Sequence, residues 1–134
     1  MNNLRFATSI HILVLLHQCK DQLITSEFIA GSINVNPVVV RREIKVLKEA
    51  GILDAKKGKV GGCFLKKDAS AIKLSDIYQL IVNQEKFGKM NHPNPQCPVG
   101  KKMNNQLSNL FTGINQSIIQ QLEQTTLEEF SNQF

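Results

Sequence analysis

Residues 34–51, NVNPVVVRREIKVLKEAG, carry helix signals at both ends and constrain the fold more than any other segment of the chain. Asn36 suits the position before a helix, because its side chain can accept a hydrogen bond from an unpaired backbone N–H group. Pro37 fits the first helical position, and Gly51 fits the residue just beyond the last one. The segment therefore predicts one helix with two defined ends.

The predicted helix has two different faces. Its apolar positions, which we expect to face a core, are Val40, Ile44 and Leu47. The opposite face carries Val38, Arg41, Arg42, Lys45 and Lys48. Such a cationic face suits the major groove of a duplex, since arginine can bind a guanine edge and lysine can reach a phosphate. The alternative is an ordinary solvated face, in which Glu49, four residues after Lys45, pairs part of the charge locally.

The next segment, AKKGKVGGCFLKKD at residues 55–68, packs five lysines and three glycines into fourteen positions. A phosphate-binding loop would need Gly-Lys-Ser/Thr, but Cys63 stands where the lysine should be. A dinucleotide fingerprint fails too, because the glycine spacing is wrong and no long βαβ unit surrounds it. We therefore predict a hairpin between the strand patterns ILDA and GCFLKK, with Lys56, Lys57 and Lys59 projecting from its tip.

Three further helices are predicted around these elements. Over roughly residues 3–19, one side of a helix carries Phe6, Ile10, Leu13 and His17. TSEFIAGSI predicts a short helix that is capped by Thr25 or Ser26 and stops near Gly31, and KLSDIYQLIVNQ predicts another. Two short helices, a tight turn and a two-stranded hairpin follow the order of a winged helix-turn-helix.

The second half of the chain begins with a proline-rich segment. Residues 85–100, EKFGKMNHPNPQCPVG, hold three of the four prolines and predict an irregular linker. A long helix is expected over roughly 101–123, with an apolar stripe of Leu107, Leu110, Ile114, Ile118 and Leu122. Such a helix is too long for the core of one small domain, so we expect its stripe to face a partner. The predicted division is a DNA-binding domain at 1–84, a linker at 85–100, and a dimerisation helix with a C-terminal tail at 101–134.

Charge is distributed unevenly along the 134 residues. Residues 1–67 carry 11 basic and 5 acidic side chains, whereas residues 68–134 carry 5 and 6. A basic half joined to a near-neutral half suggests a module that faces a polyanion and a second part that does not. The three cysteines do not form a disulfide framework, and no apolar run approaches the length of a membrane span. We therefore expect a cytoplasmic protein with no membrane partner.

Several stretches together resemble a known family. The patterns SEFIA, VRRxIxxLxxAG, KGxxGGxxL and DASAIxLxDI, followed by CPVG and TTLEEF, are similar to the bacterial winged-helix regulators typified by IscR, NsrR and CymR, the Rrf2 type. The resemblance implies a mainly α fold with a small β-hairpin wing, comprising a winged helix-turn-helix domain and a long C-terminal dimerisation helix. It also implies a homodimeric transcriptional regulator, usually a repressor, that binds a near-palindromic operator in double-stranded DNA.

The chain departs from this family at its cysteines. Iron–sulfur members carry three closely spaced linker cysteines, whereas this linker holds only Cys97, with Cys19 and Cys63 in other elements. One thiolate cannot hold such a cluster, so we expect no cofactor and no metal. Cys97 is a candidate redox-sensing thiol, because Lys101 and Lys102 could lower the pKa of its side chain; a plain linker thiol is the alternative.

These patterns favour a DNA-binding regulator without a cluster, with a redox signal or an unidentified small molecule as its effector. The competing interpretation is a winged-helix module that uses the same basic face to bind an acidic protein. An enzyme is not expected, because no Ser-His-Asp or paired-carboxylate spacing occurs in the sequence.

Overall fold

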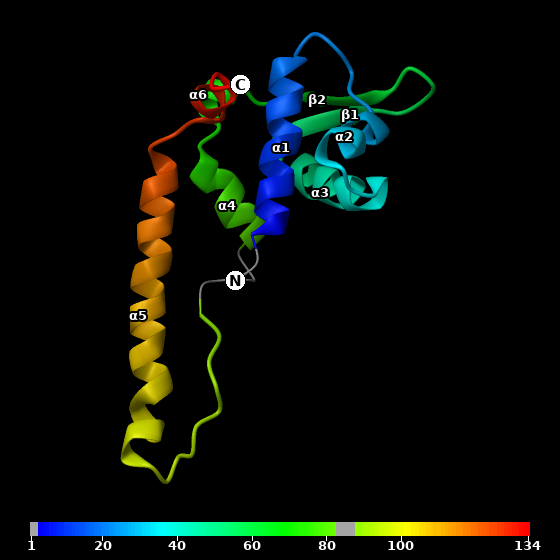
Figure 1. The fold of residues 1–134 in the computed structure, drawn as a ribbon. Helices are drawn as coiled ribbons and strands as arrows, with labels where there is room; N and C mark the ends of the chain where they lie inside the picture. The colour runs from blue at the N-terminus through cyan, green and yellow to red at the C-terminus, as the bar shows by residue number, and fades with distance from the viewer. Residues whose placement is uncertain (1–2, 83–87) are drawn as a thin grey trace.

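The computed structural model describes residues 3–82 and 88–134, and it consists mostly of helices with a two-stranded antiparallel hairpin (Figure 1). In chain order the elements are α1 (Leu4–Gln18), α2 (Ser26–Ile33), α3 (Pro37–Glu49), β1 (Leu53–Lys56), β2 (Gly62–Leu65), the 3-10 helix η1 (Ala69–Ala71), α4 (Leu74–Val82), α5 (Pro98–Glu123) and α6 (Leu127–Ser131). The predicted fold class is confirmed. Residues 85–87 of the predicted linker lie outside the described residues.

The helix-turn-helix is made of α2 and α3. The Thr25 side chain accepts a hydrogen bond from the Phe28 backbone N–H at the start of α2, as expected of an N-cap. The prediction that α2 stops near Gly31 is wrong, because the helix continues to Ile33 and ends at Asn34 in the left-handed conformation. Nothing lies close to Gly31 that would require a glycine, so it is an ordinary helical residue.

Both end signals of α3 act as predicted. The Asn36 side chain accepts a hydrogen bond from the Val38 N–H at 2.9 Å, and Pro37 is the first helical residue. Gly51 follows the helix with a φ of +77°, a conformation that favours glycine. Local signals therefore fix where α3 begins and ends. Which of its side chains face outward depends on how the helix is rotated about its axis.

The core is centred on α1, which packs against α3, α4 and α6. The sequence pattern indicated an apolar stripe on one side of α1, but Ile12 and Leu16 are also fully buried. This difference arises because elements cover α1 from several directions, which local periodicity cannot reveal. No helix within residues 3–82 and 88–134 has the length and apolar character needed to cross a membrane.

The hairpin is joined to the core at its base. Its strands pair from Leu53 with Leu65 to Lys56 with Gly62, and Ile24 adds a single bridge to Cys63. A side chain at Gly62 would collide with the backbone of Ile24, so the bridge requires glycine there. The free end of the hairpin projects away from the rest of the molecule (Figure 1).

Helix α5 stands on the side of the molecule opposite α3 and the hairpin, with α4 packed along it (Figure 1). It begins at Pro98, three residues before the expected start, and none of its 26 residues is buried. After α5 the chain returns to the core. The Leu127 side chain is fully buried, and its backbone N–H donates to the Ile72 carbonyl oxygen at 2.7 Å.

Candidate nucleic-acid interface

Helix α3 is oriented as its sequence predicts. Val40, Ile44 and Leu47 are buried, whereas the Val38 side chain is 64% exposed. The four cationic residues of the predicted face are also accessible to solvent: Arg41, Arg42, Lys45 and Lys48. The apolar stripe therefore fixes the helix so that its cationic side faces solvent.

Arg41 interacts with the preceding helix. Its Nη2 donates to Glu27 Oε1 at 3.0 Å, and both side chains are more than half exposed. A backbone hydrogen bond and the bond from Arg41 lower the pKa of Glu27, so its carboxylate is ionised at neutral pH. Solvent screens an exposed pair of this kind and its net contribution to stability is small, so a stronger anionic partner can displace Glu27.

Arg42 contacts a buried carboxylate that the sequence analysis missed. Glu43 on α3 has no exposed surface. Its carboxylate accepts hydrogen bonds from Arg42 Nε at 3.2 Å and from Arg5 Nε at 2.8 Å and Nη2 at 3.2 Å. Its burial is non-local, because Arg5 is 38 residues away in the chain.

The two lysines of α3 differ in their surroundings. Lys48 Nζ lies 3.9 Å from Asp54 Oδ1, which links the end of the helix to the first strand of the hairpin. Within the described part of the chain, no ion pair within 4.0 Å joins Lys45 to Glu49, the local pair that its spacing suggested. Part of the positive charge of α3 is thus paired, but with acidic residues other than Glu49.

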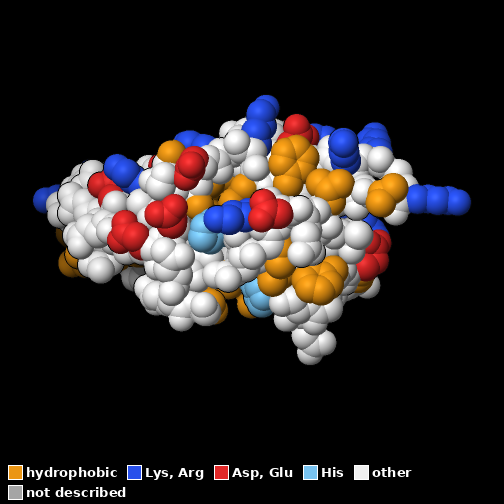
Figure 2. Space-filling model, turned by 90° about the horizontal axis from the view of Figure 1, so that it is seen from above, with side chains coloured by type: hydrophobic (Ala, Val, Ile, Leu, Met, Phe, Trp, Pro, Cys, Tyr) orange, Lys and Arg blue, Asp and Glu red, His pale blue; other side chains and the backbone are white. Residues whose placement is uncertain are grey.

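The hairpin tip presents the remaining predicted cations. Lys56, Lys57 and Lys59 are all exposed, and Gly58 has a φ of +113° that permits the tight turn. A side chain at Gly61 would collide with the Lys56 carbonyl, so this turn also depends on the close approach of two backbones. Figure 2 shows Lys and Arg side chains along the upper edge of the view and projecting from the end of the molecule where the hairpin lies.

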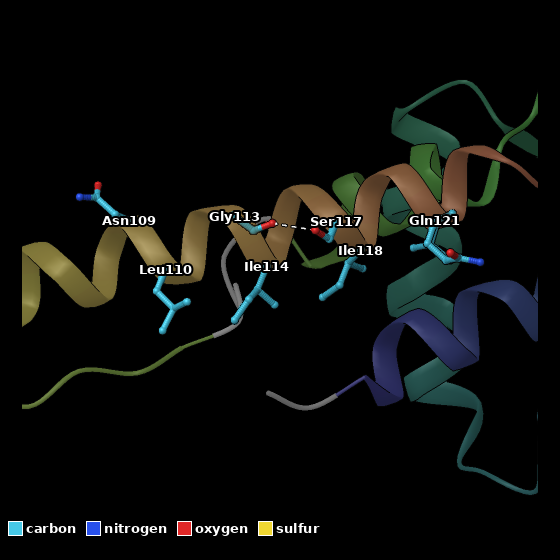
Figure 3. A pocket seen from close by; sticks show the side chains of 8 residues that line it. Asn109, Leu110, Gly113, Ile114, Ser117, Ile118 and Gln121 are labelled. Carbon is cyan, nitrogen blue, oxygen red and sulfur yellow. Dashed lines mark hydrogen bonds between the residues drawn. The ribbon is translucent and has the colours of Figure 1, made fainter.

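The apolar stripe of α5 forms a separate surface. Leu110, Ile114 and Ile118 point to the same side of the helix and line a shallow groove (Figure 3). Leu110 is 57% exposed, which is unusual for a leucine within a run of apolar side chains. Towards the end of the helix, Ile118 and Leu122 also pack against the core of their own chain. The other predicted member of the stripe, Leu107, is partly buried.

Comparison with known families finds one model that covers almost the whole chain. The Rrf2 model, described as an iron-dependent transcriptional regulator, matches residues 3–133. The described residues do not fit an iron centre, because they contain no group of three His, Cys, Asp or Glu side chains able to hold a metal. Cys63 is buried in β2, Cys19 ends α1, and only Cys97, before α5, is exposed.

Individual relatives agree with this match. The chain is 43% identical over 133 residues to "Putative HTH-type transcriptional regulator YwnA" of Bacillus subtilis (strain 168), covering 98% of each chain. It is 40% identical to the solved structure of a "putative DNA binding protein", with a TM-score of 0.75, covering 94% of this chain and 97% of that one. The structure of CymR, the global cysteine regulator of B. subtilis, shares the fold at 18% identity, with a TM-score of 0.75 and coverage of 100% and 98%. This chain therefore belongs to the Rrf2 family and is a winged-helix transcriptional regulator rather than an enzyme.

Proposed function

We propose that the protein is a homodimeric, sequence-specific DNA-binding regulator that acts as a repressor in the cytoplasm. The observation that carries this proposal is the exposed cationic side of α3, which is followed directly by a hairpin with three exposed lysines at its tip. Double-stranded DNA carries a dense row of phosphates beside a groove wide enough for a helix, so one ligand can satisfy both features.

In this proposal α3 enters the major groove. Arg41 and Arg42 contact base edges or the adjacent phosphates, and Val38 offers an apolar contact to a thymine methyl group. Lys45 and Lys48 contact phosphates at the groove edge. Arg41 must leave Glu27 to do so, and the weakness of that exposed pair keeps the cost of the exchange small.

The hairpin acts as a wing along the sugar-phosphate backbone. Lys56, Lys57 and Lys59 would each neutralise phosphate charge and release counterions, which makes the affinity fall with salt concentration. Lysine lacks the planar fork of arginine, so we assign the wing to phosphate contact rather than to base recognition. Sequence preference then resides in α3.

The second part of the proposal is a dimer built through α5. Its apolar stripe would bury itself against a second copy, in agreement with the absence of any buried residue along α5. A two-fold dimer that sets two α3 helices about 34 Å apart reads a near-palindromic operator. Residues 1–84 would bind DNA, 85–100 would connect the two parts, and 101–134 would provide the dimer helix and the tail.

A response to oxidants through Cys97 is the proposed regulatory element, and no iron–sulfur cluster is involved. The backbone N–H groups of Gly100 and Val99, at the start of α5, lower the pKa of the Cys97 thiol, which is exposed. The reactive thiolate is therefore more populated at neutral pH than in an ordinary cysteine. If wild type and Cys97→Ser lose operator binding equally under mild oxidant, Cys97 has no part in the response.

The experiment that tests DNA binding is selection of genomic fragments by the purified protein, followed by titration of the enriched sequence. We expect a near-palindromic site whose affinity exceeds that of random duplex, and loss of discrimination at one position in Arg42→Ala. Replacing a base-reading arginine should cost about 1–3 kcal/mol. Lys102→Ala, an exposed cation at the start of α5, is the control and should bind as wild type does.

The alternative function, recognition of an acidic protein through the same face, makes a different prediction. Random duplex DNA would then show no binding even at low salt, because the surface would be shaped for another partner. Affinity for random duplex that falls steeply with salt supports the DNA-binding proposal instead.

A further inference from the structure

Glu43 is a buried carboxylate on the helix that we propose reads DNA. Burying a carboxylate is unfavourable unless opposite charges and hydrogen bonds compensate for the lost water. Here the compensation comes from two guanidinium groups, those of Arg5 and Arg42, and from the buried Ser9 hydroxyl at 3.5 Å. A neutral residue of similar size would fill the same space, so the charge of Glu43 needs an explanation beyond packing.

The atoms used by Arg42 suggest that explanation. Arg42 donates to Glu43 through Nε, the nitrogen nearest its stem, and its side chain is 60% exposed. Among residues 3–82 and 88–134, neither terminal nitrogen of Arg42 makes a hydrogen bond. The N–H groups of these terminal nitrogens, Nη1 and Nη2, can donate two parallel hydrogen bonds to O6 and N7 of guanine.

Arg41 is held in the opposite way. Its contact with Glu27 uses a terminal nitrogen, Nη2, and both partners are exposed. One terminal nitrogen of Arg41 is therefore engaged until Glu27 is displaced, whereas both terminal nitrogens of Arg42 stay available while its Nε is anchored. Two adjacent arginines on one helix thus have different states before any ligand arrives.

Arg5 makes the anchor rigid. It approaches the Glu43 carboxylate with Nε at 2.8 Å and Nη2 at 3.2 Å, a two-pronged contact that fixes the plane of the carboxylate. Arg5 lies in the first turn of α1, where the helix dipole disfavours a cation, and Glu43 offsets that effect. The core helix α1 therefore fixes the acceptor to which Arg42 is attached.

We infer that Glu43 is a positioning residue: held by Arg5, it orients Arg42 so that the terminal edge of that guanidinium is presented to a base pair. Arg42 is then the pre-oriented base reader, and Arg41 is recruited only when it exchanges Glu27 for DNA. This inference rests on the proposed DNA-binding function. Its physical basis is that a side chain already held in its bound orientation loses less freedom on binding.

A double-mutant cycle between Glu43→Gln and Arg42→Ala tests the inference on the enriched operator. The amide that Glu43→Gln introduces is nearly isosteric but uncharged, so the Arg42 anchor weakens while the side-chain volume stays. We expect Glu43→Gln to lower operator affinity about tenfold when Arg42 is present and less than about twofold when it is alanine. The parallel cycle with Arg41→Ala is the matched control and should be additive.

The outcomes separate the inference from the function on which it rests. Equal losses in both Arg42 backgrounds would show that Glu43 supports only the α1–α3 packing, and would overturn the inference. Failure of the wild-type protein to bind any duplex would instead overturn the proposed function. Circular dichroism at the assay temperature establishes that each variant is folded.

A measurement on the unaltered protein covers the case in which Glu43→Gln does not fold. The Nε–H protons of Arg41 and Arg42 can be compared by ¹⁵N-detected hydrogen exchange in the absence of DNA. The Arg42 Nε–H should exchange with water at least about threefold more slowly than that of Arg41, because only Arg42 donates through this atom. Equal exchange rates would show that Arg42 is not anchored and would overturn the inference.

Discussion

Replacing Leu127 by alanine tests whether the end of the chain is an integral part of the fold. The Leu127 side chain is fully buried in the core that surrounds α1. Removing a buried leucine side chain costs its transfer free energy and leaves a cavity, together about 3 kcal/mol. The backbone hydrogen bond from Leu127 to Ile72 remains, so the loss reflects the side chain alone.

The magnitude can be converted to a melting temperature. At about 2.1 cal/mol/K per residue, the 134-residue chain has an unfolding entropy of about 0.28 kcal/mol/K, so Tm should fall by about 10 °C. The assay is thermal unfolding followed by circular dichroism, at one fixed protein concentration because association shifts Tm. Val99→Ala, at a side chain 65% exposed, is the control and should change Tm by less than about 2 °C. A decrease for Leu127→Ala no larger than that of Val99→Ala would refute the claim that α6 belongs to the core.

Three further predictions concern other parts of the chain. Leu110→Asp, on the exposed α5 stripe, should shift the protein from dimer to monomer in sedimentation at micromolar concentration; an unchanged dimer would exclude this face. Alkylation by iodoacetamide should show Cys97 reacting at a lower pH than a free thiol, whereas the pKa of Cys63 is raised by burial and it should stay unreactive; equal rates would contradict this. Gly31→Ala should raise the unfolding free energy by up to about 1 kcal/mol, because the site is open and helical, whereas Gly61→Ala should lower it by colliding with a backbone carbonyl; chemical denaturation measures both signs.

Signals confined to a few neighbouring residues were predicted well from the sequence. The caps at Thr25 and Asn36 and the stop at Gly51 depend on bonds within one helical turn, and all three occur as expected. The predicted end of α2 at Gly31 is wrong because Asn34, not Gly31, takes the left-handed conformation that ends the helix. Residue propensity alone does not decide which of the two takes it.

Features that depend on distant parts of the chain could not be predicted. The burial of Glu43 requires Arg5 on α1, and the burial of Leu127 requires the α1 surface against which α6 packs. For the same reason the sequence pattern predicted one buried side of α1, whereas in the structure α3, α4 and α6 cover α1 from several sides. The DNA-binding and dimerisation residues remain predictions. Exposure of the α3 and hairpin cations supports the first set, whereas in the second set Leu110 is exposed and Leu107, Ile114, Ile118 and Leu122 are partly buried.

The salt dependence of operator binding tests the central claim most directly. Replacing Lys56, Lys57 and Lys59 together by alanine removes six wing lysines from the dimer, so the slope of log K against log salt should fall by about 5.4 units, at about 0.9 per phosphate contact. The matched control is the triple replacement of Lys89, Lys101 and Lys102, three exposed cations outside α3 and the hairpin, and it should leave the slope unchanged. A wing variant that keeps the wild-type slope, or a control that loses as much, would contradict the account.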